Sequence, residues 1–479
     1  MAKPSDVFDR EHEWSALERF ASSERAGATL GLVYGRRRQG KTYLLEALVE
    51  VVGGTYVTAL EQSAAQNLAR FAAAYQRAEH TQGRIVFASW EEALSALLSL
   101  DGLVVIDELP YLLQTAPELP SVLQALLSPR SPVARQSRTR LVLCGSALST
   151  MRGLLAGSAP LRGRAALELM VHPFSFHDAA RYWGTALDPE LSVMLHALVG
   201  GTPAYLDMCG SAPSSVSEFD DWVVTTLLDP ASAMFREGSV LLAEEPRITD
   251  AAVYFSVLGA ISEGATRRGE IAATVGRPET ALGHALKVLT ETQLVLALDD
   301  ALKRRRTTYH IAEPVLRFHQ LVVAPNEARL VRHRSAEVWE EVSDTVLSRI
   351  YGPHFEHLAR AWCTESASAT TLGGTASQVA PSVVACIKHR EGHEVDVVVL
   401  ENKPHAKQRI IAIGEAKWRS APMDTSHLER LIHVRDLLDV TSTRLLCFSK
   451  SGFTPALVST ARDRSDVELV DLTRIYDGD

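Results

Sequence analysis

The sequence lacks several features that would place it in particular classes of protein. Its cysteines show no CxxC spacing, which argues against a disulfide framework or a cysteine-based zinc site. No run approaches the roughly 20 apolar residues that span a bilayer, and the first residues lack a signal-peptide core. We therefore expect a cytoplasmic protein without membrane contact, with reduced thiols that mostly lie in the core. The cysteines are Cys144, Cys209, Cys363, Cys386 and Cys447.

An excess of positive charge is also missing. The formal net charge is -9, so any DNA contact must come from local basic patches and not from the whole surface. The 479 residues, 46% of them apolar, suffice for about two to four domains with their own cores.

Short β-rich runs alternate with helical stretches in the first half of the chain. This alternation predicts a parallel sheet with helices on both faces. The predicted strands are Leu30–Tyr34, Thr55–Val57, Ile85–Phe87, Leu103–Ile106 and Leu141–Cys144. From about Pro189 to Glu245 the pattern is mostly helical, with a break at Gly200–Pro203, and indicates a helical lid.

Three short helices followed by two strands are expected next, an order typical of a winged helix-turn-helix. The helices are Ala252–Ile261, Arg268–Val275 and Glu279–Thr292, and the strands are Leu294–Leu298 and Thr308–Ile311.

A final α/β segment follows a polar stretch at Asn326–Glu337. It begins with a helix around Tyr351–Cys363, continues through a loose stretch at Glu365–Ala380, and then forms strands. These strands are Ser382–Lys388, Glu394–Leu400 and Arg409–Glu415.

The segment between the first strand and the next helix matches the Walker A pattern of phosphate-binding loops. It reads Gly35, Arg36, Arg37, Arg38, Gln39, Gly40, Lys41 and Thr42, and a helix continues from Tyr43. Its glycines let backbone N–H groups surround phosphate, Lys41 extends to the β and γ oxygens, and Thr42 takes one magnesium position. The loop therefore predicts binding of ATP and Mg²⁺.

Two carboxylates end the buried strand Leu103–Ile106. Asp107 is expected to hold the hydrated magnesium and Glu108 to polarise the attacking water, which favours hydrolysis over binding alone. Ser146, after the strand Leu141–Cys144, is predicted either to sense the γ-phosphate or lytic water or to cap the following helix.

Two arginines near the end of the same domain are candidates for an arginine finger. Arg162 and Arg164 would supply positive charge to the transferring phosphoryl group, in cis or from a neighbouring subunit of a homo-oligomer. The alternative is that both are simple surface arginines.

Together these segments resemble the archaeal-type ATPase family, near the AAA+ and STAND branches of P-loop ATPases. The resemblance rests on Gly35–Thr42, Asp107–Leu112, Leu143–Ser146, Pro160–Arg164, Pro173–Phe176 and Gly200–Leu206, and continues through Glu244–Arg247 and Tyr309–Phe318. It implies an ASCE or AAA+-like sheet, with the segment Phe8–Glu11 near the adenine and Pro203 in a lid that reports nucleotide state.

The predicted winged helix carries little base-reading chemistry. The helix Glu279–Thr292 offers only His284 and Lys287. The wing tip, Lys303–Arg306, concentrates four positive charges that suit phosphate contact, with Arg267 and Arg268 in the same domain. The wing is expected to contact DNA; the alternative is a protein-docking or solvated hairpin.

Charged residues also interrupt the last predicted strands. Asp396 lies within an apolar strand, and Glu415 and Lys417 end the next one, an arrangement that resembles the PD-(D/E)XK nuclease signature. Two such carboxylates hold divalent ions, and the lysine orients or deprotonates water. Glu356, on the preceding helix, is a further candidate ligand or an exposed carboxylate. The alternative is a structural ion-pair cluster.

We predict an α/β protein with a P-loop core at residues 1–188, a helical lid at 189–247, a winged helix-turn-helix at 248–325 and a restriction-endonuclease-like domain at 338–479. The predicted function is an ATP-hydrolysing switch that controls a DNA-acting, metal-dependent nuclease in defence, repair or mobile elements. The alternatives are a regulatory STAND-type ATPase whose C-terminal domain binds nucleic acid or a partner without cleaving, and a nucleotide-dependent scaffold.

Overall fold

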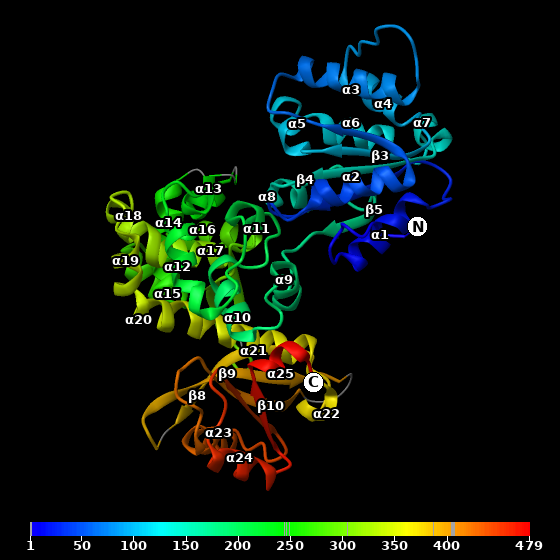
Figure 1. Ribbon diagram of the computed structural model, residues 1–479. Coiled ribbons are helices and arrows are strands. Elements are labelled where there is room, and N and C mark those ends of the chain that lie inside the picture. The colour runs from blue at the N-terminus through cyan, green and yellow to red at the C-terminus, as the bar shows by residue number, and fades with distance from the viewer. Residues whose placement is uncertain are drawn as a thin grey trace. The chain divides into compact units, whose positions relative to one another are not determined.

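The computed structural model describes residues 2–243, 245, 247–248, 250–303, 305–386, 388–403 and 408–479 (Figure 1). The chain forms two compact units. The first comprises the chain up to Pro173, together with Thr202–Ala204 and the described residues of 244–247, and the second comprises the rest. Within the described ranges, no helix is both long and apolar enough to cross a bilayer.

A five-stranded parallel sheet forms the centre of the first unit, with strand order β2-β3-β4-β1-β5. The strands are β1 (Thr29–Tyr34), β2 (Gly54–Thr58), β3 (Gly102–Asp107), β4 (Thr139–Gly145) and β5 (Ala165–Met170). Strand β4 lies between β1, which precedes the phosphate loop, and β3, which ends in Asp107. The predicted parallel α/β sheet is confirmed.

Both faces of this sheet are covered by helices, because successive side chains of a strand point to opposite faces. Val33 and Val105 pack on the side of α1 (Glu11–Ala21) and α2 (Lys41–Val52), whereas Leu32 and Ile106 pack on the other side. That second face is covered by α3 (Ala64–Ala78), α4 (Trp90–Leu97), α5 (Leu109–Thr115) and α6 (Leu119–Leu126). The unit also contains α7 (Pro132–Gln136) and α8 (Leu148–Gly153).

One predicted strand of this unit is wrong and one was missed. Ile85–Phe87 is not a strand: Val86 is 68% exposed, while Phe87 turns inward against Tyr75. This apolar triplet anchors a connecting segment to the core without pairing its backbone. The fifth strand is instead Ala165–Met170, a short segment in which exposed and partly buried residues alternate before the buried Leu169.

The second unit begins with helices, as predicted for the lid. They are α9 (Phe176–Trp183), α10 (Pro189–Val199), α11 (Ala204–Cys209), α12 (Val216–Trp222) and α13 (Glu237–Ala243), with short turns at Val223–Leu227 and Ala233–Arg236. The predicted break is confirmed, because α10 ends at Val199 and the next helix begins at Ala204. A Cβ at Gly201 would lie 2.1 Å from the Phe174 carbonyl oxygen, so only glycine permits this close approach.

Three helices and a hairpin then follow in the predicted order. They are α14 (Ala251–Ser262), α15 (Arg268–Val275), α16 (Glu279–Glu291) and the antiparallel pair β6 (Val295–Asp299) and β7 (Thr307–Ile311). Arg304, at the predicted wing tip, lies outside the described residues, as do Glu244 and Pro246.

The polar stretch that was predicted after the hairpin forms helices. Residues 324–341 are largely helical, as α18 (Ala324–Leu330) and α19 (Ser335–Glu341), and Leu330 and Val338 are buried. These few apolar residues suffice to anchor short helices whose other positions are charged, a pattern that is easily taken for a solvated linker. The neighbouring helical segments are α17 (Pro314–Phe318), His319–Val323, α20 (Ser343–Thr345) and Val346–Tyr351.

A second five-stranded sheet, with order β12-β11-β10-β9-β8, forms the C-terminal part of this unit. Its strands are β8 (Gln378–Cys386), β9 (Glu391–Glu401), β10 (Arg409–Lys417), β11 (Arg444–Ser449) and β12 (Val467–Asp471). Strands β8 to β10 pair antiparallel, and β10 to β12 pair parallel. The predicted loose stretch is partly structured, since it contains α22 (Ala369–Leu372) and β8 starts at Gln378.

Helices lie on both faces of this second sheet (Figure 1). They are α21 (Gly352–Glu365) and α25 (Leu472–Asp477) on one face, and α23 (Thr425–Leu437) and α24 (Pro455–Arg462) on the other. Leu428, Leu431 and Leu457 fill the core beneath the latter two.

The end of the β6–β7 hairpin is fixed to β8. The Ser382 hydroxyl donates a hydrogen bond of 2.6 Å to Oδ1 of Asp300, and the Ala301 N–H donates one of 3.3 Å to the Pro381 carbonyl. Ala301 is buried in the apolar core of the C-terminal sheet. The hairpin therefore packs against this sheet and does not project alone into solvent.

Candidate nucleotide site and carboxylate cluster

The loop Gly35–Thr42 joins β1 to α2 and depends on its two glycines. A Cβ at Gly35 would lie 2.4 Å from the Val171 carbonyl oxygen and 2.7 Å from Oε1 of Gln39. Gly40 caps α2 with a φ of 81°, a left-handed conformation that side chains disfavour. The loop is thus held tightly at its start and turns sharply into the helix, which leaves the first N–H groups of α2 available for an anion.

Lys41 begins α2 and is buried, with an exposed fraction of 5%. Its ammonium donates a hydrogen bond of 2.6 Å to the Arg36 carbonyl. Burial lowers the pKa of Lys41, and the nearby Glu108 and Asp107 charges act in the opposite direction. The ammonium is therefore held over the loop beside two carboxylates.

Asp107 connects the loop to the end of β3. The Thr42 hydroxyl donates a hydrogen bond of 2.8 Å to its Oδ2, and the Tyr56 hydroxyl donates one of 2.6 Å to the same oxygen. Oδ1 accepts the Glu108 N–H at 2.8 Å. Burial and the Asp107 charge raise the pKa of Tyr56, so its hydroxyl stays protonated and donates. Thr42 and Asp107 are the oxygen ligands, direct or through water, that Mg²⁺ prefers.

Glu108 follows Asp107 in a left-handed conformation, with a φ of 54°. Burial, and then the Asp107 charge, raise the pKa of Glu108, whereas Lys41 and Arg37 oppose this shift. The Ser146 hydroxyl donates a hydrogen bond of 3.2 Å to Oε1 of Glu108. The structure thus brings Ser146 to the carboxylate and not to the amide of a helix N-terminus; no side-chain cap is present at α8.

The three loop arginines have different surroundings. Arg37 donates a hydrogen bond of 2.6 Å to the Tyr111 hydroxyl and lies close enough to Glu108 to affect its pKa. The Arg36 carbonyl holds Lys41, and the Arg38 carbonyl accepts the Ala204 N–H at 3.4 Å, next to Pro203. The loop therefore contacts the segment predicted to report nucleotide state.

The predicted arginine fingers make contacts elsewhere. Arg164 donates a hydrogen bond of 3.2 Å to the Leu127 carbonyl at the end of α6, and Arg162 donates one of 2.7 Å to the Gly157 carbonyl. Tyr43 is half exposed, and its hydroxyl donates to Oδ2 of Asp6 at 2.6 Å. Within the part of the chain that the structure describes, none of these three contacts involves Lys41, Asp107 or Glu108.

Arg10 is a buried residue that sequence reasoning did not single out beyond its segment. Its Nη2 donates to the His172 carbonyl at 2.8 Å and to the Gln39 carbonyl at 3.3 Å, and its Nη1 pairs with Glu13 at 3.0 Å. The segment Phe8–Glu11 is therefore fastened to the phosphate loop. A left-handed Arg10, with a φ of 70°, is not visible in the sequence pattern.

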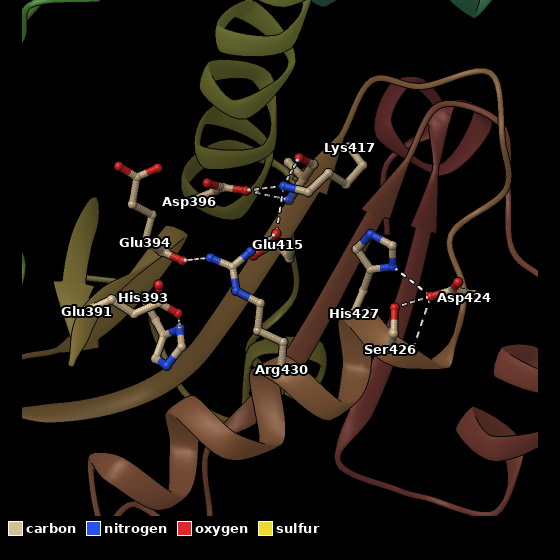
Figure 2. Close-up of polar contacts among 11 residues, drawn as sticks. Glu391, His393, Glu394, Asp396, Glu415, Lys417, Asp424, Ser426, His427 and Arg430 are labelled. Atoms are coloured by element: carbon tan, nitrogen blue, oxygen red, sulfur yellow. Dashed lines mark hydrogen bonds and ion pairs between the residues drawn. The ribbon is translucent and has the colours of Figure 1, made fainter. Parts of the chain in front are cut away.

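The second predicted site lies on β9 and β10 of the C-terminal sheet (Figure 2). The Lys417 ammonium is 2.6 Å from Oε1 of Glu415 and 3.5 Å from Oδ2 of Asp396. The Ala416 N–H donates a further hydrogen bond of 2.9 Å to Oδ2 of Asp396. The structure therefore brings the three predicted residues together, with Glu415 1% exposed.

Arg430 on α23 joins this cluster and was missed by the sequence interpretation. It donates a hydrogen bond of 2.8 Å to Oε1 of Glu415 and one of 2.9 Å to the Glu394 carbonyl. Figure 2 shows its guanidinium between these two residues. No motif spacing announces it, because α23 returns to the strands only through tertiary packing.

Glu356 on α21 belongs to the same electrostatic group. Burial, and then the Asp396 charge, raise the pKa of Glu356 to about 7, while Arg360 and Lys417 oppose this shift. Arg360 also donates a hydrogen bond of 2.9 Å to the Asp396 carbonyl. The alternative of an exposed helix carboxylate is wrong, because Glu356 is not exposed.

The carboxylate oxygens leave room for ligation. Within the described residues, Lys417, Arg430 and the Ala416 N–H contact one oxygen of each group, Oδ2 of Asp396 and Oε1 of Glu415. Their second oxygens and Glu356 form a donor set that fits a hard divalent ion. The same charges also fit a structural cluster, since Lys417 and Arg430 balance Asp396 and Glu415.

Comparisons with known proteins agree with the first unit. Residues 7–208 match a family model described as an ATPase domain predominantly from Archaea, and residues 319–430 match a model of archaeal and bacterial proteins of unknown function. An uncharacterized protein of Methanocaldococcus jannaschii is 27% identical over 324 residues, which cover 66% of this chain and 69% of the relative.

Two solved structures are similar to part of this chain. A Walker-type ATPase of Pyrococcus abyssi matches with a TM-score of 0.50 and 21% identity, covering 66% of this chain and 97% of that one. The ORC2 protein of Aeropyrum pernix, in ADPNP and ADP complexes, matches with a TM-score of 0.45 and 18% identity, covering 72% and 97%. Residues 7–208, which contain the phosphate loop and the paired carboxylates, thus form an ATPase domain of the archaeal type.

Proposed function

We propose that the protein hydrolyses ATP with Mg²⁺ and uses its nucleotide state to control a DNA-acting, metal-dependent nuclease-like domain. The observation that supports hydrolysis most strongly is the hydrogen-bonded chain from Thr42 through Asp107 to Glu108 and Ser146. These contacts support a magnesium-binding role for Thr42 and Asp107 beside a carboxylate suited to polarise water.

Each residue has a defined task in this proposal. Lys41 and the N–H groups that begin α2 bind the phosphates, and Thr42 with Asp107 would hold Mg²⁺, which neutralises the developing charge. Glu108 orients the attacking water, and its raised pKa makes it a better proton acceptor than an ordinary carboxylate. Ser146 keeps Glu108 in place or releases it as the γ-phosphate changes.

The assignment of arginines changes with the geometry. Arg37, beside Glu108, would supply positive charge to the transferring phosphoryl group within one chain. Arg164, which contacts α6, would act only on the nucleotide of a neighbouring subunit in an oligomer. Either role requires ATP to be bound, because the phosphoryl group supplies the charge that the guanidinium recognises.

The proposed signal runs from the phosphate loop to the C-terminal sheet. In the first unit, the Arg38 carbonyl contacts Ala204, so the loop and the lid break share a hydrogen bond. In the second unit, Asp300 and Ala301 fasten the β6–β7 hairpin to β8. A movement of the helical lid region would thus be passed to the C-terminal sheet through the hairpin.

For the nuclease half, Asp396, Glu415 and Glu356 would hold a divalent ion that polarises a phosphodiester and lowers the pKa of its bound water. Lys417 would then orient the water and neutralise charge. Burial and the Asp396 charge raise the pKa of Glu356 to about 7, which supports a site in which this carboxyl group faces another carboxylate.

Nicking of supercoiled plasmid tests this half. We expect wild-type protein with Mg²⁺ or Mn²⁺ to nick the plasmid, Asp396→Ala to be inactive, and Glu429→Gln, an exposed carboxylate change on α23, to remain active. Absence of metal-dependent nicking with either ion, with and without ATP, would remove the nuclease function.

A regulatory ATPase with a non-cleaving C-terminal domain is the second candidate. The observation that favours it is the balance of Lys417 and Arg430 against Asp396 and Glu415, which stabilises the cluster without a metal. In that case the protein would not cleave DNA, and Lys417→Ala would alter only its stability or partner binding.

A further inference from the structure

Four metal-ligand side chains converge at the end of the β8–β9 hairpin, away from the carboxylates described above. Cys386 is the last residue of β8, His389 lies in the turn, His393 lies on β9 and His433 lies on α23. Val384 of β8 pairs with His393 of β9, so His393 lies close to the end of β8, where Cys386 stands. The ligand atoms of these four described residues, one sulfur and three imidazole nitrogens, all lie within 4.8 Å of one another.

The separations between the ligand atoms match a tetrahedral site. Sγ of Cys386 lies 3.3 Å from Nδ1 of His389 and 3.4 Å from Nε2 of His433, and Nδ1 of His389 lies 3.3 Å from Nε2 of His393. With Zn–S near 2.3 Å and Zn–N near 2.0–2.1 Å, the edges of a tetrahedron are about 3.4–3.6 Å. The remaining separations are within 4.8 Å, so one ion at the centre would contact all four atoms after side-chain adjustment.

The chemistry of the set selects the ion. One thiolate and three neutral imidazoles suit zinc, and four protein ligands close the coordination sphere as in structural zinc sites. Cys386 and His393 are at most 9% exposed and His433 is partly buried, whereas His389 is exposed, so the ion would be shielded except on the side of the turn.

A carboxylate stands behind one of the imidazoles. Nδ1 of His393 lies 4.0 Å from Oε1 of Glu391 (Figure 2), whereas its Nε2 lies 3.3 Å from Nδ1 of His389. Zinc-bound histidines commonly present their second nitrogen to such a carboxylate, which fixes the tautomer.

We propose that Cys386, His389, His393 and His433 bind one Zn²⁺ ion, which fastens the β8–β9 hairpin to α23. The absence of CxxC spacing argued against a cysteine-based zinc site, but here histidines from three elements supply the remaining ligands. His433 lies one helical turn after Arg430, so the same fastening holds the arginine that contacts Glu415. The proposal itself does not depend on ATP hydrolysis or on DNA cleavage.

Metal content of the full-length protein tests the site. Untagged protein is used because a polyhistidine tag would bind zinc itself. It is purified without chelator, and zinc is measured by plasma mass spectrometry against protein concentration. We expect one zinc per chain in the wild type and its loss in His393→Ala and in His433→Ala. His427→Ala, on the same helix but outside the cluster, is expected to retain zinc, as is Asp396→Ala, which excludes the carboxylate site as its location.

A second measurement covers variants that fail to fold. Wild-type protein stripped with a chelator and refilled with Co²⁺ should show visible bands of tetrahedral cobalt and a thiolate charge-transfer band that Cys386→Ser removes. Wild-type protein that neither retains zinc nor gives tetrahedral cobalt would overturn the proposal. Undiminished zinc in folded His393→Ala and His433→Ala would overturn it as well.

Discussion

The hydroxyl of Thr42 lies 2.8 Å from Oδ2 of Asp107 and joins the first turn of α2 to the end of β3. The two residues are 65 positions apart in the chain, and only the parallel sheet brings them together. Because both are ligands of the kind that magnesium takes in phosphoryl transfer, this hydrogen bond marks the place where nucleotide, metal and hydrolytic carboxylate would meet.

Replacement of the water-polarising carboxylate should separate binding from hydrolysis. We expect Glu108→Gln to slow ATP hydrolysis by about 100- to 10,000-fold, because general-base catalysis contributes that much. Nucleotide binding should persist, since Lys41 and the loop are unchanged. Phosphate release and binding of a fluorescent ATP analogue measure the two effects. Glu50→Gln, an exposed change on α2, is the control; equal rates in both variants would contradict the role of Glu108.

The start of the phosphate loop should not tolerate a side chain. In Gly35→Ala the new Cβ would lie 2.4 Å from the Val171 carbonyl oxygen. Such overpacking costs about 1–3 kcal/mol, or roughly 5- to 150-fold in ATP affinity if the loop must distort. Isothermal titration calorimetry measures the change. Gly153→Ala meets no atom within 4 Å and should bind ATP normally; a Gly35→Ala protein of wild-type affinity would show that the loop is not constrained.

The hairpin should contribute to DNA binding through fewer charges than its sequence offers. Arg306 lies 3.8 Å from Oδ2 of Asp300, so Lys303 and Arg305 are the described wing cations left for phosphate. If both contact DNA, the double change to Ala should reduce the slope of log affinity against log salt by about 1.8. Fluorescence anisotropy at several salt concentrations measures it. An unchanged slope, equal to that of an Arg135→Ala/Arg138→Ala control, would favour the protein-docking alternative.

Acid should weaken the second unit between about pH 6.5 and pH 4. Burial lowers the pKa of His196 to about 4, and its Nδ1 lies 3.0 Å from Nε2 of His354, whose pKa is also lowered. The unfolded chain, with pKa near 6.5, binds these protons first. Stability is therefore present above pH 6.5 and is lost as the pH falls, by at most about 1.4 kcal/mol per pH unit for each histidine.

Hydrogen exchange in α10 and α21 at pH 7.5, 6 and 5 measures this loss. His196→Leu should make the exchange rates less dependent on pH, whereas His12→Gln, an exposed change in α1, should not. The same pH dependence in wild type and His196→Leu would mean that other groups cause the acid sensitivity.

Lys417 provides a sharper distinction between cleavage and binding. If it orients water, Lys417→Ala should abolish nicking while DNA binding persists. If it only balances Asp396 and Glu415, its removal should lower stability, because it takes away an ammonium that pairs with both carboxylates and leaves Glu415 to its pairing with Arg430. Plasmid nicking and thermal unfolding of the same variant measure the two outcomes, and loss of stability alone would contradict the catalytic role.

Much of the ATP site could be predicted because its residues are local in sequence. The strand, loop and helix from Leu30 to Val51 form a continuous pattern, and Asp107 ends a second apolar strand. Residues that approach from elsewhere could not be foreseen. Tyr56 contacts Asp107 from the neighbouring strand, and Arg10 reaches the loop from a left-handed turn.

The C-terminal sheet shows the same limit. Asp396, Glu415 and Lys417 could be grouped because they lie on successive strands, whereas Arg430 and the Cys386 cluster depend on where α23 packs. The predicted strand Ile85–Phe87 was wrong, because its β propensity was outweighed by the lack of a partner strand among the described residues. Residues that lie on the same or successive elements could therefore be grouped from the sequence, whereas residues brought together by tertiary packing could not.

The coupling of the two halves is tested most directly by plasmid nicking as a function of nucleotide. Wild-type and Lys41→Ala proteins are compared with Mg²⁺ or Mn²⁺, each without nucleotide, with ATP and with a non-hydrolysable ATP analogue. We predict that the nicking rate of the wild type changes with nucleotide, and that Lys41→Ala nicks at one rate in all conditions. Nicking by the wild type at the same rate with and without nucleotide would contradict control of the C-terminal domain by the ATPase.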